Sequence, residues 1–305
     1  MSLTFRGGRL PADPSKPRLK LSRYLVGSSL PPVPAAVDWD VAVSAFNMLG
    51  NDEWGDCHWA ATYHSLQTWS ANVGAELTPT TADTLQAYAE ATGFNPHAGS
   101  PGENPTDQGT VMQDGLNWWR KTGVPVSYAG GQSRHKILAF AEVDHRNPGE
   151  LRQAVALFGE VLLGISFPAS AMDQFNDSKP WDVVPGATIE GGHAICTAKY
   201  DATSHTPWTV VTWGQEQKVT QAFLDAYLEE AWVVVAPEWI ATSGSTPSGL
   251  NLAALGQDFT GLTGDPAPWA NGPTPPNPPG PPDPPLPWSL LLVLWRAIRS
   301  LFGGR

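Results

Sequence analysis

The sequence predicts an α+β fold, in which helical segments come first and β-rich segments follow. The chain has 305 residues, of which 41% are hydrophobic, and its 14 tryptophans add to the apolar surface available for a substantial core. Apolar side chains recur at helical spacing between residues 57 and 159, whereas residues 161–236 contain short apolar runs divided by Gly, Pro and Asp. Helices followed by strands favour an α+β domain over a doubly wound parallel sheet.

The helical part should contain four helices. Their expected ranges are 57–73, 80–92, 109–122 and 148–159. Asp56 directly precedes the first helix and is a suitable N-cap residue. Asn147 stands in the same position before the fourth, where Pro148 would occupy the first helical position.

The β-rich part should contain short strands separated by turns. The expected strands are 161–167, 194–200, 208–213 and 231–236. Beyond residue 237 the periodic pattern fades. The sequence therefore predicts an extended N-terminal arm over residues 1–33, one domain over 34–240, and a Pro/Gly-rich linker over 241–287.

A short apolar helix is expected at the C-terminus, over residues 288–305. It follows a stretch with 12 prolines in the 22 positions 266–287, which should adopt a stiff polyproline II conformation. As a helix, residues 288–302 would be about 22 Å long, too short for a bilayer of about 30 Å. Docking on its own domain, on a protein partner or in a membrane interface would each bury it, and the stiff linker favours the last two.

Composition and charge exclude several classes of protein. A net charge of −11 without a sizeable basic patch argues against a nucleic-acid partner. Two cysteines are too few for a disulfide-stapled secreted scaffold. We find neither a signal peptide in residues 1–30 nor a transmembrane run, so cytoplasmic synthesis is the default and the final location is unknown.

Cys57 and His193 are the candidates for chemistry. A thiol at a helix N-terminus beside an imidazolium has a lowered pKa, which favours the nucleophilic thiolate. His193 follows the flexible pair Gly191-Gly192 and opens an apolar strand. The two residues are 193 − 57 = 136 positions apart, within the roughly 130–150 typical of a papain-type Cys and His.

Four motifs in the sequence resemble those of the papain-like cysteine peptidase family. Val-Asp-Trp at 37–39 and the run Asn51 to Cys57 are similar to the start of the mature family enzymes, and Gly-Gly-His-Ala at 191–194 resembles the motif around their histidine. Trp-Gly at 213–214 resembles a later family motif. The resemblance covers about 200 residues and is nearest to the minimal bacterial and phage members.

The resemblance implies a two-lobed fold, with a helical lobe packed on a β-rich lobe and a cleft between them. It implies cysteine-dependent hydrolysis of peptide bonds in a peptide or protein substrate, through a thioester and without cofactor or metal. Cys57 would be the nucleophile and His193 the base, with Asn51 in the oxyanion hole. The remaining implied site residues support the site (Gly55, Trp213) or bind substrate (Gly109, Gly192).

Two positions depart from the family pattern. The family's third catalytic residue, an Asn two positions before Trp213, is replaced by Val211, which cannot accept the second imidazole proton. Asn51 stands where the family has Gln and is one methylene shorter. These departures keep open a catalytically weak or inactive scaffold that serves as a binding or structural module.

The same residues would also suit different chemistry. Peptidoglycan cross-link cleavage or acyl transfer would use the same nucleophile and base. Cys57, His58, His64 and His193 offer zinc-ligand chemistry, although their spacing matches no common structural zinc site. We do not expect the N-terminal arm to gate the site in the way that the family's long inhibitory propeptide does.

Overall fold

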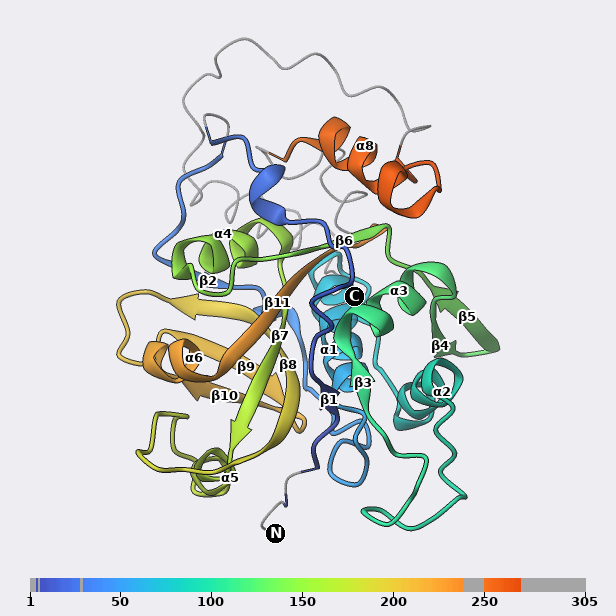
Figure 1. The fold of residues 1–305 in the computed structure, drawn as a ribbon, viewed down its shortest axis with the longest axis vertical. Coiled ribbons are helices and arrows are strands. Elements are labelled where there is room, and N and C mark those ends of the chain that lie inside the picture. The colour runs from blue at the N-terminus through green and yellow to red at the C-terminus, as the bar shows by residue number, and fades with distance from the viewer. Residues whose placement is uncertain (1–3, 5, 28–29, 238–249, 270–305) are drawn as a thin grey trace, which may run out of the picture. The chain divides into compact units, whose positions relative to one another are not determined.

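The computed structural model describes residues 4, 6–27, 30–237 and 250–269. Residues Met1–Ala270 form one compact unit, and the predicted C-terminal helix lies outside the described residues. The predicted α+β class is confirmed (Figure 1). The elements in chain order are β1 (Arg9–Leu10), η1 (Leu21–Arg23), β2 (Ala36–Asp38), η3 (Asp40–Ala42), α1 (Cys57–Asn72), α2 (Thr81–Thr92), β3 (Thr110–Val111), α3 (Met112–Lys121), β4 (Val124–Tyr128), β5 (Gly131–His135), β6 (Ala139–Glu142), α4 (Pro148–Phe158), β7 (Val161–Pro168), α5 (Ala169–Asn176), β8 (Ile189–Asp201), β9 (Trp208–Thr212), β10 (Gln215–Val219), α6 (Gln221–Tyr227), β11 (Leu228–Val235) and α8 (Leu252–Thr263).

A seven-stranded antiparallel sheet forms the β-rich half. Its order is β10-β9-β8-β7-β11-β6, and β2 pairs with β8 outside this path. Side chains of β7 alternate between two cores, as the pleat requires. Val161 and Leu163 contribute to the core that contains α4 and α6 residues, whereas Leu162 contributes to the core that contains α1 residues.

Helix α1 lies at the centre of the fold, and every residue from Cys57 to Ala71 is buried. It packs against β7, β8 and β9 on one side and against α2 and α3 on the other (Figure 1). A helix buried all round cannot show a simple apolar stripe, because both its faces need apolar partners. This packing fixes the start of α1 against β8.

The two predicted helix caps differ in the structure. Asn147 caps α4, because its side chain accepts hydrogen bonds from the backbone N–H groups of Gly149 and Glu150. Asp56 occupies the N-cap position of α1, but its side chain makes no capping hydrogen bond. Its carboxylate instead accepts a hydrogen bond from Asn51, at 3.1 Å, so the prediction for Asp56 was right in position and wrong in mechanism.

Described residues of the N-terminal segment pack against the domain, which differs from the extended arm expected over residues 1–33. Arg9, Leu21 and Tyr24 are buried, and β1 pairs in parallel with β3. In Figure 1 this segment, drawn in dark blue, crosses between the sheet and the helical side. A sequence rich in Pro, Gly and basic side chains suggests a solvated arm, but here its few apolar side chains and Arg9 find buried partners.

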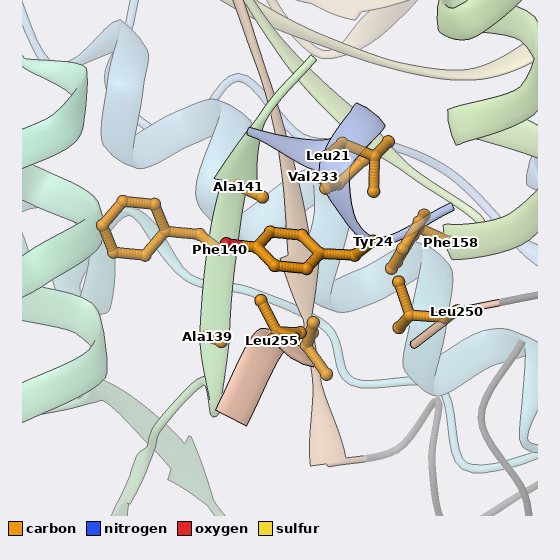
Figure 2. A pocket seen from close by; sticks show the side chains of 10 residues that line it. Leu21, Tyr24, Ala139, Phe140, Ala141, Phe158, Val233, Leu250 and Leu255 are labelled. Atoms are coloured by element: carbon orange, nitrogen blue, oxygen red, sulfur yellow. The ribbon is translucent and has the colours of Figure 1, made fainter. Parts of the chain in front are cut away.

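Helix α8 corrects part of the predicted linker over residues 241–287. It packs through Leu255 and Phe259 onto the same core as Tyr24. Figure 2 shows the Tyr24 ring among the apolar side chains of a small cavity that Leu255 also lines. The Tyr24 hydroxyl donates to Asp258 at 2.9 Å, so α8 and the N-terminal segment stabilise one another.

Candidate active site

Cys57 is the first residue of α1, and its side chain is fully buried. The loop before it turns through left-handed conformations at Leu49 and Gly50, where φ is 62° and 96°. The backbone N–H of Ala194 in β8 donates to Cys57 Sγ at 3.3 Å. Because Ala194 follows His193 directly, this hydrogen bond brings the thiol to the strand that carries the predicted base.

The His193 ring is held by aromatic and polar contacts in the sheet. Its Nε2 lies 2.8 Å from the Thr212 hydroxyl oxygen. The Trp213 indole stacks on the imidazole, with a centroid distance of 4.6 Å and an interplanar angle of 15°. Phe167 contacts the same ring edge-to-face at 5.5 Å. These contacts restrict the orientation of the imidazole.

Trp213 reaches the imidazole because of an uncommon turn. Trp213 and Gly214 form the two-residue connection between β9 and β10, with φ of 47° and 73°. Positive φ at both positions is the signature of a type I′ hairpin turn, and it is unusual for a bulky residue such as tryptophan. A side chain at Gly214 would lie 2.9 Å from the backbone of Asn47 and Met48, so this turn also requires glycine.

Thr212 rather than Val211 contacts the imidazole. Val211 pairs with Cys196 in the β8–β9 register and is buried in the core that contains Cys57. Successive residues of a strand face opposite sides, so the side chain after Val211 points the other way. We expected Val211 to leave the His193 imidazole without a polar partner. The hydroxyl of the next residue, Thr212, supplies that partner instead.

Burial keeps both candidate groups uncharged in this arrangement. It raises the pKa of the Cys57 thiol to about 12, although the Ala194 N–H opposes the shift. Burial also lowers the pKa of His193 to about 3, and the positive charge of Arg9 lowers it further. The expectation of a lowered thiol pKa is therefore wrong for this arrangement, because burial disfavours the thiolate.

Asn51 lies in the loop before α1, where its side-chain amide is already bonded. Its Nδ2 donates to Asp56 Oδ1 at 3.1 Å and to the Trp54 carbonyl at 3.4 Å. Burial raises the pKa of Asp56 well above its ordinary value, and the bond from Asn51 opposes that shift. Asn51 could act in an oxyanion hole only if its amide released one of these acceptors.

The N-terminal segment lies against all three glycines that the sequence analysis placed in the site. A side chain at Gly109 would meet the Gly8 carbonyl oxygen at 2.3 Å, and one at Gly192 would meet the Arg9 carbonyl oxygen at 2.2 Å. A side chain at Gly8 would in turn meet the Gly55 carbonyl oxygen at 2.1 Å. Such close backbone approach is possible only without Cβ atoms.

A hydrogen-bonded chain fixes two of these glycines relative to one another. Asp107 accepts from the Gly55 N–H at 3.0 Å and from the Tyr88 hydroxyl at 2.7 Å. The Tyr88 oxygen accepts from the Gly109 N–H at 2.8 Å. Asp107 and Tyr88 thus hold the backbone of Gly55 and Gly109, the two glycines on the helical side that the N-terminal segment contacts.

Solved structures identify the fold, whereas sequence comparisons do not. No protein-family model and no curated protein matches the chain. Xylellain, a cysteine protease from Xylella fastidiosa, matches with a TM-score of 0.57 at 16% identity, covering 75% of this chain and 96% of its own. The fold is papain-like.

Two further structures extend this result. Procathepsin B S9 from Trypanosoma congolense has a TM-score of 0.53 at 12% identity and covers 75% of this chain and 86% of its own. Digestive procathepsin L 3 from the larval midgut of Tenebrio molitor has a TM-score of 0.50 at 12% identity, covering 76% of each chain. At these identities the comparison establishes the papain-like fold alone.

Within the papain-like fold, Cys57 belongs to the helical half and His193 to the sheet. Thr212 and Arg9 were not predicted as site residues from the sequence. Thr212 could have been found from the alternation of a strand, in which neighbouring side chains face opposite sides, so that Thr212 and Val211 point in different directions. The signal for Arg9 was the preceding pair Gly7-Gly8, which permits close backbone approach.

The zinc hypothesis finds no support in the part of the chain that the structure describes. No group of three or more His, Cys, Asp or Glu side chains is placed there to hold a metal ion. His58 instead lies in an aromatic contact with Trp59, with ring centroids 5.0 Å apart. Among the same residues, no helix is long and apolar enough to cross a membrane.

Proposed function

We propose that the chain is a cysteine peptidase that hydrolyses peptide bonds, with Cys57 as nucleophile and His193 as general base. The observation that carries this proposal is the hydrogen bond from Ala194 N–H to Cys57 Sγ at 3.3 Å. It joins the N-terminus of α1 to β8, the strand that carries His193. Thr212 and Trp213 position the His193 imidazole. A nucleophile, a base and an orienting group are the parts that thiol catalysis needs.

In the proposed reaction, His193 takes the thiol proton and the Cys57 thiolate attacks the scissile carbonyl carbon. The resulting oxyanion is stabilised by the Cys57 backbone N–H and by the Asn51 amide, once that amide has released the Trp54 carbonyl. The C–N bond then breaks as His193 gives its proton to the leaving amine. Water, deprotonated by His193, hydrolyses the thioester and restores the thiol.

The covered site has to open before this chemistry can begin. A thiol of pKa about 12 and an imidazole of pKa about 3 do not exchange a proton at neutral pH. Both shifts come first from burial, so entry of solvent and substrate would reverse them. Displacement of the residues next to Gly55, Gly109 and Gly192 is the movement that would admit a substrate.

Peptide hydrolysis by matched variants tests the proposal. Arg9 forms ion pairs with Glu229 and Glu230, so Arg9→Ala should loosen the N-terminal segment. A library of fluorogenic peptides would be incubated with the full chain and with Arg9→Ala, Cys57→Ala and His193→Ala variants, the last two also combined with Arg9→Ala. We expect cleavage by Arg9→Ala and a loss of at least roughly 1,000-fold when Cys57 or His193 is also removed. Cleavage that survives Cys57→Ala, or no cleavage by any variant, would overturn the proposal.

A non-catalytic binding module is the second candidate. It is favoured by the Asn51 amide, which is bonded to Asp56 and Trp54, and by the uncharged state of the dyad. Such a module would bind peptides in the cleft without consuming them. Tight peptide binding by Arg9→Ala together with no cleavage would assign the chain to this class.

A further inference from the structure

The segment Gly8–Leu10 lies between Gly192 of β8 and strand β3 and is bonded to both sides as a bound peptide strand would be. Gly8 N–H donates to the Gly192 carbonyl at 3.2 Å, and Thr110 N–H donates to the Gly8 carbonyl at 2.7 Å. Arg9 and Leu10 then pair in register with Thr110 and Val111 of β3. Backbone pairing of this kind accepts any sequence, so selectivity has to come from the side chains.

The Arg9 side chain enters a pocket with two carboxylates, and only 2% of its side-chain surface is exposed. Its Nη1 donates to Glu230 Oε1 at 2.8 Å, and its Nη2 donates to Glu229. Glu230 is buried and Glu229 is half exposed. A planar guanidinium can satisfy two carboxylates at once, which a single ammonium does less well.

The carboxylates are themselves held in place. Glu230 Oε2 accepts a hydrogen bond from Trp232 Nε1 at 2.7 Å, and Glu229 accepts one from the Ser166 hydroxyl. Gly164 leaves the room that the Arg9 stem occupies, because a side chain there would lie 2.7 Å from Arg9 Cδ. The pocket is thus shaped and charged for a long cationic side chain.

This arrangement is a poor device for stability alone. A buried ion pair often stabilises a protein no more than apolar side chains of the same size would. Its value lies in discrimination, because a neutral occupant leaves Glu230 buried without a counter-charge. Arg9 and Glu230 are 221 positions apart in sequence, so Arg9 enters the pocket on a distant segment of the chain, as a side chain of a separate peptide would.

We infer that the pocket formed by Glu229, Glu230, Ser166 and Gly164 recognises an arginine side chain of a peptide substrate, and that Arg9 is its intramolecular occupant. The inference rests on the proposed function, because it assigns the substrate class of that same cleft. Arg9 competes with arginine-containing peptides, so a substrate must displace the N-terminal segment before it binds.

Binding of short peptides tests the pocket independently of catalysis. The probes are fluorescein-labelled peptides with Gly-Gly-Arg-Leu, Gly-Gly-Lys-Leu or Gly-Gly-Met-Leu at the centre, titrated by anisotropy against full-length Arg9→Ala. We expect the Arg peptide to bind at least tenfold tighter than the Met peptide, and the Lys peptide to lie between them. Combining Arg9→Ala with Glu230→Gln should remove that preference. Equal affinity for the three peptides would overturn the inference.

Hydrolysis of the same peptides separates the two proposals. Arginine-selective binding without cleavage would contradict the proposed peptidase function and support the arginine pocket. Cleavage by Arg9→Ala with equal kcat/KM for the Arg and Met peptides would keep the peptidase and reject the pocket.

A second variant serves if Arg9→Ala does not fold. Glu229→Gln removes the half-exposed carboxylate and leaves the Arg9–Glu230 pair in place. It should weaken the hold on the N-terminal segment and raise the rate of Cys57 alkylation at least threefold. The control is Asp177→Asn, which removes a surface ion pair with Lys179 and should leave the rate unchanged. An unchanged rate in Glu229→Gln would count against the pocket.

Discussion

At the residue scale, the Thr212 hydroxyl contacts the His193 imidazole from the position next to the one where the family resemblance places an amide. The family pattern asks for an amide at position 211, and the strand offers a buried valine there. The hydroxyl at position 212 reaches Nε2 at 2.8 Å from the next position along the strand. A hydroxyl can accept the imidazole N–H as an amide oxygen would.

The first prediction concerns that hydroxyl. Thr212→Val should lower kcat/KM of the proposed peptidase activity by roughly 10- to 100-fold, because a lost hydrogen bond to the proposed base, His193, is worth about 1–3 kcal/mol. Thr212→Ser keeps the hydroxyl and should retain most of the activity. Steady-state kinetics in the Arg9→Ala background would measure both, and equal values for Val and Ser would reject the orienting role of Thr212.

The family pattern suggests that Val211→Asn would raise activity, whereas the structure predicts no gain. Val211 is 1% exposed and pairs with Cys196, so an amide there would be buried away from the imidazole. We expect about 1–3 kcal/mol of lost stability and no gain in activity. A denaturant titration gives the stability, and a rise in kcat would show that position 211 does face the base.

Asp40 provides a pH prediction away from the cleft. Its carboxyl is buried and accepts a hydrogen bond from Thr68 at 3.0 Å. Burial raises its pKa from 3.8 to about 7, and the Thr68 bond opposes that shift. The folded state therefore favours the protonated acid, so this contribution to stability is complete below pH 4 and is lost as pH rises towards 7.

Asp40→Asn should remove this dependence. The neutral amide carries no charge to bury, so the variant should be more stable than the wild type at pH 8, by an amount on the order of a few kcal/mol. At pH 4 the difference should shrink. Thermal melting at both pH values would measure it, and an unchanged difference between pH 4 and pH 8 would contradict the assignment.

At the element scale, the sequence predicted the long and strongly apolar elements well. The helices expected at 57–73, 80–92 and 148–159 are found at Cys57–Asn72, Thr81–Thr92 and Pro148–Phe158. The hairpin β4–β5 was missed, because residues 131–135 are polar and mostly exposed and so lack an alternating pattern. Its Gly130, with φ of 104°, was the available turn signal.

Helix α8 was missed for a different reason. Gly256 and Gly261 lower its helix propensity, so the helix depends on its Asn251 cap and on packing in the core that contains Tyr24. We predict that Leu255→Ala lowers the free energy of unfolding by about 2–4 kcal/mol, because Leu255 is 2% exposed. Tyr24→Phe should cost about 1 kcal/mol through loss of the Asp258 hydrogen bond.

Chemical denaturation measures both variants of this contact. Val41→Ala is the matched control, since Val41 is 79% exposed and should change stability little. If Leu255→Ala behaves like Val41→Ala, α8 does not contribute to the cooperative fold. The fold would then end near β11, as the sequence pattern suggests.

At the scale of the whole molecule, the course of the N-terminal segment was beyond the reach of sequence. Its composition suits a solvated arm, and the decisive contacts join Arg9 to residues more than 200 positions away. The motifs around Cys57 and His193 could be found because each is local in sequence. The position of the N-terminal segment over them could not be predicted, because it depends on contacts between residues that are far apart in the sequence.

The final prediction tests whether the N-terminal segment controls Cys57. Gly8→Ala would place a side chain 2.1 Å from the Gly55 carbonyl and should lift the segment from the cleft without changing any charge. In the wild type, a thiol pKa of about 12 makes iodoacetamide labelling slow at pH 7, with a rate that keeps rising up to pH 10. In Gly8→Ala, labelling of Cys57 at pH 7 should be at least roughly tenfold faster and should level off at a lower pH, because solvent entry removes the burial that raises the pKa. Two controls accompany this variant. Cys196 is buried in the core, so its labelling should stay slow in both proteins. Gly27→Ala is the control, since a side chain there would contact nothing within 4 Å. If Gly8→Ala and Gly27→Ala label at the same rate, the segment does not gate the thiol, and the high pKa of Cys57 is a property of the α1–β8 contact itself.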